Sequence, residues 1–131
     1  MAAYIEAADI TDLMLNEAGW ATKLAAKIVK SEDAANDMLK TMGLTSSDVA
    51  DTVPYLFKEW NIAWVGMEMC FDAMGKNNIS LPEFEKYRVK WEVYQKRLKN
   101  IQSQLTPSVI AGTDYDVRDR STAMTGILFR N

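Results

Sequence analysis

The sequence predicts an all-α fold, a helical bundle organised on a long antiparallel helix hairpin, with three to four short N-terminal helices and an extended C-terminal arm. Apolar residues between positions 53 and 105 recur at steps of three and four, which is the spacing of one helix face and not the alternation of a strand. A Gly-Lys-Asn-Asn segment at positions 75–78 interrupts this pattern and is typical of a helix end. So short a connection makes the helices, at about 53–76 and 81–105, antiparallel neighbours.

The apolar stripes of these two helices define an expected core. Ser80 is a capping residue for the second helix, with Pro82 in its first turn and Glu83 three residues after the cap. Cys70 lies on the first stripe and the chain has no histidine to activate it, so we expect a buried, unreactive thiol. The residues expected to fill the hairpin core are Phe57, Trp60, Trp64, Met67, Phe71, Phe84, Trp91 and Leu98.

The N-terminal part predicts shorter helices. After an extended piece around Tyr4, Asp9 or Thr11 can cap a first helix that ends at Gly19. A second helix is expected over residues 21–30. Ser31, followed by two acids, is typical of a helix start and predicts a third helix that ends before position 43.

The C-terminal part changes character after the hairpin, which divides the chain into a bundle at 1–111 and an arm at 112–131. Pro107 ends the second long helix, and one more turn is possible before Gly112. The arm is polar, with mixed charges, until it reaches three large apolar residues at 127–129. Burying each of them would gain about 1.5–3 kcal/mol. The arm therefore either folds back on its own core or docks on another chain.

Composition narrows the function classes. A chain of 131 residues, 48% hydrophobic and 25% charged, is typical of one soluble domain with its own core. The absence of histidine removes the commonest general base and transition-metal ligand, and the single cysteine excludes an internal disulfide framework. No run of 18 apolar residues or secretory signal is visible. We therefore expect no enzyme, no cofactor, no metal and no membrane span.

Charge is distributed unevenly along the chain. Residues 1–52 hold four lysines against nine acids, a net charge of −5, whereas residues 53–105 hold eight basic residues against six acids, a net charge of +2. Neither part has the positive excess that binding to a phosphate backbone requires. The basic residues of the second long helix form either a solvated, salt-bridged face or a contact face for the acidic half of a neighbouring copy.

The order of features resembles the small head–tail connector (adaptor, or head-completion) proteins of tailed bacteriophages. Residues 4–10, Tyr-Ile-Glu-Ala-Ala-Asp-Ile, look like that family's opening, and residues 53–58, Val-Pro-Tyr-Leu-Phe-Lys, look like its entry into a long helix. The stretch that begins Phe-Glu-Lys-Tyr at 84–87 is similar to its second long helix, and residues 105–112 are similar to its exit. The resemblance covers most of the chain, but each motif is short.

This resemblance implies a structural virion protein at the head–tail junction, assembled in the bacterial cytoplasm. Such proteins form a ring, typically of twelve copies, with the portal protein above and a tail or neck protein below. DNA passes through the ring without sequence-specific binding. The C-terminal arm would dock on the portal through Asp116, Arg118, Arg120, Ile127, Leu128, Phe129 and Arg130. The alternative is a small cellular helical adaptor or regulator that binds one protein partner; a transcriptional regulator or an enzyme fits the residues less well.

Overall fold

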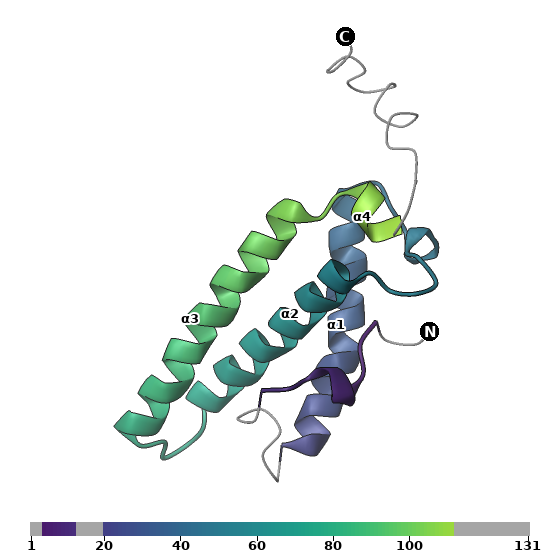
Figure 1. Ribbon diagram of the computed structural model, residues 1–131. Coiled ribbons are helices and arrows are strands. Elements are labelled where there is room, and N and C mark those ends of the chain that lie inside the picture. Colours follow the sequence, from purple (N-terminus) through teal and green to yellow (C-terminus); the bar gives the residue numbers. More distant parts are fainter. Residues whose placement is uncertain (1–3, 13–19, 112–131) are drawn as a thin grey trace.

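The computed structural model describes residues 4–12 and 20–111, and within them every regular element is a helix (Figure 1). The prediction of an all-α chain is confirmed. The elements in order are η1 (Ala7–Asp9), α1 (Ala21–Thr41), η2 (Ser46–Asp48), α2 (Tyr55–Met74), α3 (Leu81–Gln104) and α4 (Pro107–Ala111), where η denotes a short 3-10 helix.

The helix α1 is a single long helix, and the predicted break at Ser31 is wrong. The Ser31 hydroxyl donates a hydrogen bond to the carbonyl oxygen of Ile28 at 2.7 Å, inside the same helix. A serine bonded in this way does not cap a new helix. Ser31 and Glu32 are both buried, so neither marks a solvent-exposed start.

The start of the chain also differs from the prediction. Asp9 does not open a helix but closes the short η1 turn, where its carboxylate accepts a hydrogen bond from the backbone N–H of Glu6 at 2.8 Å. Thr11 and Asp12 are not helical. The remainder of the predicted first helix, residues 13–19, lies outside the described residues.

The end of α1 shows why a glycine is needed there. Gly43 has a φ of 76°, in the left-handed region that favours glycine. Its N–H donates to the carbonyl oxygen of Lys40, and the N–H of Leu44 donates to that of Leu39. This pair of bonds is a Schellman motif, and the side chains of Leu39 and Leu44, which the motif brings to the same side, are both buried.

The helices α2 and α3 are joined by residues 75–80 and run in opposite directions (Figure 1). Pro54 lies just before α2 in an extended conformation rather than in the first turn of that helix. At the start of α3, the Ser80 hydroxyl accepts a hydrogen bond from the N–H of Glu83 at 3.3 Å, with Pro82 in the first turn, as the sequence indicates.

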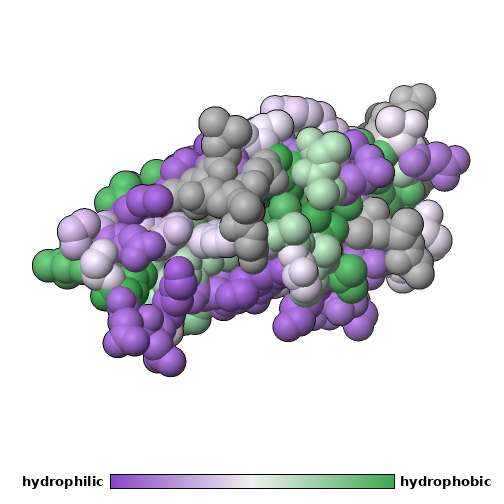
Figure 2. All heavy atoms as spheres, turned by 90° about the horizontal axis from the view of Figure 1, so that it is seen from below, coloured by the Kyte–Doolittle hydropathy of each residue, from purple (hydrophilic) through white to green (hydrophobic). Residues whose placement is uncertain are grey.

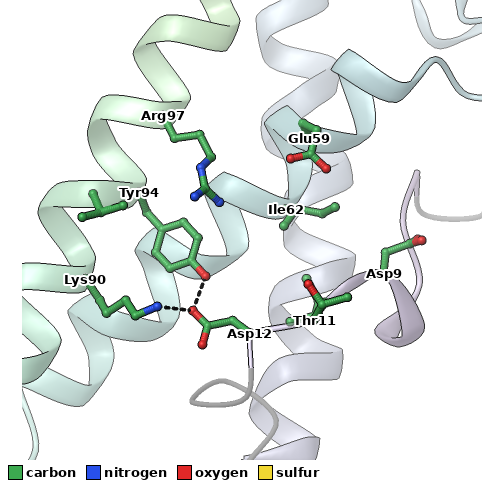
Figure 3. Close-up of a pocket in the computed structure, with 10 residues that line it drawn as sticks. Asp9, Thr11, Asp12, Glu59, Ile62, Lys90, Tyr94 and Arg97 are labelled. Carbon is green, nitrogen blue, oxygen red and sulfur yellow. Dashed lines mark hydrogen bonds and ion pairs between the residues drawn. The ribbon is translucent and has the colours of Figure 1, made fainter.

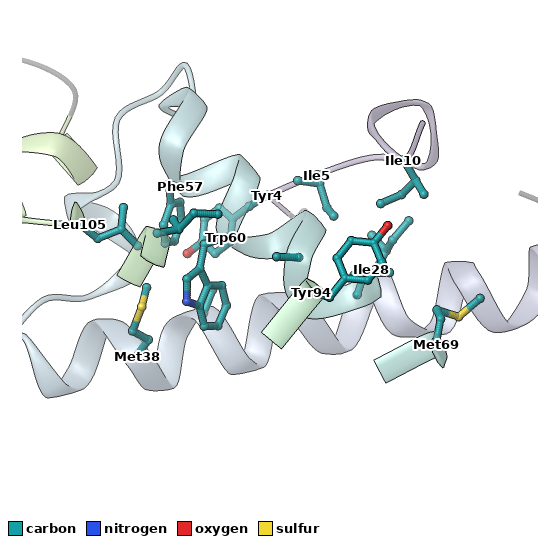
Figure 4. Close-up of a cluster of buried hydrophobic side chains, with 14 of the residues drawn as sticks. Tyr4, Ile5, Ile10, Ile28, Met38, Phe57, Trp60, Met69, Tyr94 and Leu105 are labelled. Carbon is teal, nitrogen blue, oxygen red and sulfur yellow. The ribbon is translucent and has the colours of Figure 1, made fainter. Parts of the chain in front are cut away.

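The helix α2 is buried on two faces, whereas the sequence predicts one stripe. It packs against both α1 and α3. Trp60 and Gly66 face α3, where Trp60 lies near Gln102 and Gly66 lies against Tyr94. On the other side, Phe57 contacts Tyr4 edge-on with ring centroids 4.8 Å apart (Figure 4).

The expected hairpin core is only partly correct. Phe57 and Trp60 are buried, and most of the other expected residues are partly buried: Trp64, Met67, Phe84, Trp91 and Leu98. Phe71 is 58% exposed, so it does not belong to the core. Its ring lies 6.4 Å from that of Trp91, at the edge of the α2–α3 contact. The positions that are buried instead, Val65 and Met69, lie on the second buried face of α2.

Candidate functional site

The residues expected to dock on a portal lie outside the described part of the chain. Asp116, Arg118, Arg120 and the apolar tip at 127–129, together with Arg130, all fall within residues 112–131. The described chain ends in α4. The side chain of Ile110 in this helix is fully buried, and the carbonyl oxygen of Ile110 accepts a hydrogen bond from the N–H of Ala50. The last described residues are therefore anchored to the bundle.

A polar pocket lies where the N-terminal segment crosses α2 and α3 (Figure 3). At its centre the carboxylate of Asp12 accepts a hydrogen bond from the Tyr94 hydroxyl at 2.6 Å and another from the Lys90 ammonium at 2.9 Å. Glu59 and Arg97 also line the pocket. The Asp12 side chain is only 15% exposed, so both bonds are partly shielded from water.

The chemistry of this pocket favours a structural role. Burial, followed by the hydrogen bond to Asp12, raises the pKa of Tyr94, so its hydroxyl keeps its proton over the physiological range. A carboxylate that already accepts hydrogen bonds from an ammonium and a phenol is a weak candidate for a general base. The geometry is that of a tether, which fixes the N-terminal segment to the middle of α3.

We expect Asp12→Ala to lower the free energy of unfolding by about 1–2 kcal/mol, because it leaves the Tyr94 hydroxyl and the Lys90 ammonium without this partner. Urea unfolding followed by circular dichroism measures the change. Asp51→Ala, at an exposed position, is the matched control and should stay within about 0.5 kcal/mol of the wild type. Equal stability of the two variants would show that the tether contributes little.

A second ionic contact joins α1 to α2. The Lys27 ammonium lies 3.1 Å from Asp72 and 3.4 Å from Glu68. Burial alone would lower the pKa of Lys27, but the hydrogen bond and charge of Asp72, with those of Glu68, raise it overall. The lysine therefore stays charged and holds α1 in register along α2.

Cys70 is fully buried, as its place on the stripe predicts. Burial, with a further contribution from the negative charge of Asp12, raises the pKa of its thiol to about 11. Since the thiolate is the nucleophile, this cysteine is unreactive at neutral pH while the protein is folded.

The basic face of α3 is partly neutralised by its own acids. Arg88 forms ion pairs with Glu85 at 2.8 Å and Glu92 at 2.7 Å. The hydrogen bond from Arg88 also lowers the pKa of the Glu85 carboxyl. Lys90 pairs with Asp12, as described above. The basic residues that are exposed on this helix are Lys86, Lys96, Arg97 and Lys99.

Several large apolar side chains remain on the surface. Figure 2, a view from below Figure 1, shows hydrophobic atoms at its left end, the side on which α3 begins, and further hydrophobic atoms among hydrophilic ones in its centre and towards its right. On α3 itself, Val89 is 51% exposed and Val93 is 45% exposed. These two side chains lie one turn apart on the same face, so they form one exposed apolar surface. The other exposed large apolar residues are Val29, Tyr55, Phe71 and Leu81.

The described residues contain neither a membrane-spanning helix nor a cluster of metal ligands. None of the helices there is long and apolar enough to span a lipid bilayer. Within residues 4–12 and 20–111, no group of three or more histidine, cysteine, aspartate or glutamate side chains is arranged to bind a metal ion.

Comparison with protein-family models, with curated proteins and with solved structures found no significant match to this chain. The described residues therefore define the class of this protein only as an all-helical bundle.

Sequence reasoning missed the features that depend on contacts between distant segments. Asp12 carries no sequence signal for its pairing with Tyr94, which is 82 residues away. Gly66 was not singled out, although a glycine within a helical stripe is a signal for close backbone approach. The exposed Val89 and Val93 could have been found, because neither lies on the expected apolar stripe.

Proposed function

We propose that this chain is a structural adaptor of a tailed bacteriophage, a ring subunit at the head–tail junction. In this proposal its helical bundle, organised on the α2–α3 hairpin, surrounds and extends the DNA channel. Residues 112–131 act as an arm that docks on the portal protein, and a tail or neck protein binds below. DNA passes without sequence-specific contacts.

The single observation that carries the proposal is the order of features along the chain. An all-helical bundle ends in the short anchored helix α4, and 20 residues with three large apolar residues near their end follow it. The local sequences that resemble the connector family fall at the N-terminal segment, at the starts of α2 and α3, and at α4. The division into bundle and arm and the local sequences are two parts of the same resemblance, and together they support this function.

The apolar tip gives the proposed arm a clear chemistry of binding. Ile127, Leu128 and Phe129 would be buried on the portal, with Arg118, Arg120 and Arg130 pairing with carboxylates around them and Asp116 with a basic group. Large side chains buried at the centre of an interface carry most of its binding energy. The arginines would set the orientation and the rate of docking more than the affinity.

We expect replacement of all three tip residues by serine to weaken binding to the portal by at least thirtyfold, since even one strong anchor contributes about 2 kcal/mol. The probe is the purified portal protein encoded in the same genome, and the readout is binding measured by biolayer interferometry. Ser121→Ala with Thr122→Ala, in the polar part of the same segment, is the matched control and should bind like the wild type.

Both variants should retain the helical circular dichroism of the wild type, which separates lost binding from lost folding. Unchanged portal binding by the serine variant would overturn the docking role of the tip. A genome that encodes no portal protein would overturn the virion function and favour a small cellular helical adaptor or regulator.

A further inference from the structure

We propose that the outward face of α3 binds the outward face of α1 of a second copy, so that copies associate head to tail. This inference deepens the proposed function, because it assigns the surfaces through which subunits of the ring would meet. It rests on the described residues alone and not on residues 112–131.

The first surface is on α3. Val89 and Val93 line a shallow apolar groove whose edges are Glu85, Lys86 and Lys90. The core face of α3 is elsewhere, since Tyr87, Tyr94 and Ile101 are the residues of this helix that are buried. One turn beyond Val93 the same face carries the exposed side chain of Lys96. Along the direction of the chain, the α3 surface therefore begins with the apolar residues Val89 and Val93 and continues with the basic residue Lys96.

The second surface is on α1. Val29 is 61% exposed, and Ala25 and Ala26, one turn before it, are exposed as well. Asp33 and Asp37 follow on the same face at steps of one turn, and both are exposed. Lys40, one turn further on, pairs with Asp37 at 3.9 Å, so Asp33 is the acid of this face that the contact uses. The α1 surface is apolar first and acidic next, again in the direction of the chain.

The arrangement of the helices allows these surfaces to meet. In Figure 1, α1 and α3 lie on two sides of α2, and both run from the bottom to the top of the view. If Val29 of one copy lies against Val93 of the next, Asp33 then lies beside Lys96, because both charged residues are about one helical turn further on. The small Ala25 and Ala26 permit a close approach of the two helices.

The contact is complementary in charge and in position, and it joins two different faces. An interface between different faces is heterologous, so each copy can bind one neighbour on each side, and the series either closes into a ring or extends as a filament. The pairing also agrees with the net charges of the two parts of the chain. Residues 1–52, which contain α1, hold four lysines against nine acids, a net charge of −5. Residues 53–105, which contain α3, hold eight basic residues against six acids, a net charge of +2.

Cysteine cross-linking of the full chain with a short bismaleimide tests this geometry. The Val29→Cys/Val93→Cys double variant should give a ladder of dimers, trimers and larger species. A mixture of the two single variants should give dimers, and each single variant alone should remain monomeric under denaturing electrophoresis. The natural Cys70 is buried, so the wild type is a background without cross-links.

The matched control moves one cysteine to a position that is exposed but lies off the proposed surface. Tyr55 is 75% exposed, and the Tyr55→Cys/Val93→Cys double variant should give no ladder. Charge reversal adds a second test in the cross-linking background. Asp33→Lys should reduce the cross-linked fraction about tenfold, and Asp33→Lys combined with Lys96→Asp should restore it, since like charges opposed across an interface disfavour association.

Two results would overturn the inference. Cross-linking by Val93→Cys alone would indicate a two-fold contact between α3 faces. An absence of a ladder from the Val29→Cys/Val93→Cys variant would mean that copies use another face, that the chain's own C-terminal residues cover the α3 groove, or that the chain does not self-associate. Because portal binding is measured separately through the tip variant, loss of the ladder with intact portal binding removes this interface and leaves the adaptor function standing.

Discussion

Gly66→Ala is expected to lower the free energy of unfolding by about 2–3 kcal/mol and the thermal midpoint by about 10 °C. A Cβ at this position would lie 2.5 Å from the Cε1 and Cζ atoms of the Tyr94 ring. The ring has little room to move away, because Tyr94 is buried, its hydroxyl is bonded to Asp12, and the Arg97 guanidinium lies over it at 5.4 Å. The helices α2 and α3 must therefore separate to accept one methyl group.

The control for this prediction is a second glycine of the same hairpin. At Gly75 the nearest atom to an added Cβ is the Asp72 carbonyl oxygen at 3.6 Å, an ordinary contact. Gly75→Ala should therefore be neutral or slightly stabilising. In a double-mutant cycle, Gly66→Ala should cost less in a Tyr94→Leu background than alone, because the clashing ring is gone. A Gly66→Ala protein as stable as the wild type would mean that the two helices lie further apart.

The protein is expected to lose about 2–3 kcal/mol of stability between pH 9 and pH 11 through Cys70 alone. The folded state holds the pKa of this thiol at about 11, above its ordinary value of 9.0, because the side chain is buried. The unfolded chain therefore releases its thiol proton first as the pH rises. The contribution is fully present below pH 9 and is lost as the pH approaches the folded pKa. Tyr94, whose pKa is also raised, acts in the same direction from about pH 10 upward.

Urea unfolding at a series of pH values between 8 and 11 measures this loss. Cys70→Ala is the control: it lowers stability at every pH by creating a small cavity, but its stability should fall less steeply above pH 9. The comparison is thus between slopes and not between absolute stabilities. Identical slopes for the wild type and Cys70→Ala would show that the thiol keeps an ordinary pKa in the folded protein.

The sequence predicted the ends of helices most accurately where a few neighbouring residues decide the structure. Ser80, Pro82 and Glu83 together specify the start of α3, because capping needs only the first turn. Gly43 marks the end of α1 for the same reason. Ser31 shows the limit of such signals. Its hydroxyl bonds back to the carbonyl oxygen of Ile28 inside a helix, and the local sequence does not distinguish such a serine from one that starts a helix.

The core of α2 could not be read from periodicity in the same way. The stripe that contains Trp60 faces α3. Because α2 is covered by two neighbouring helices, it also buries residues outside this stripe, and Met69 is one of them. Phe71 was placed in the core by its position on the stripe and is instead at an exposed edge. Which of these apolar positions is buried depends on the angle at which α1 crosses, and that angle has no local sequence signature.

By itself, the sequence determined that the described residues are helical, that α2 and α3 are two long helices, and where those two helices begin and end to within about two residues. These properties follow from apolar spacing, capping and glycine placement, which act over one or two turns. The tertiary structure alone decided that α1 is continuous, that Asp12 is bonded to Tyr94, and that Gly66 lies against the Tyr94 ring. Those contacts join residues far apart in the chain, and their energies depend on burial and distance, which exist only once the helices have packed.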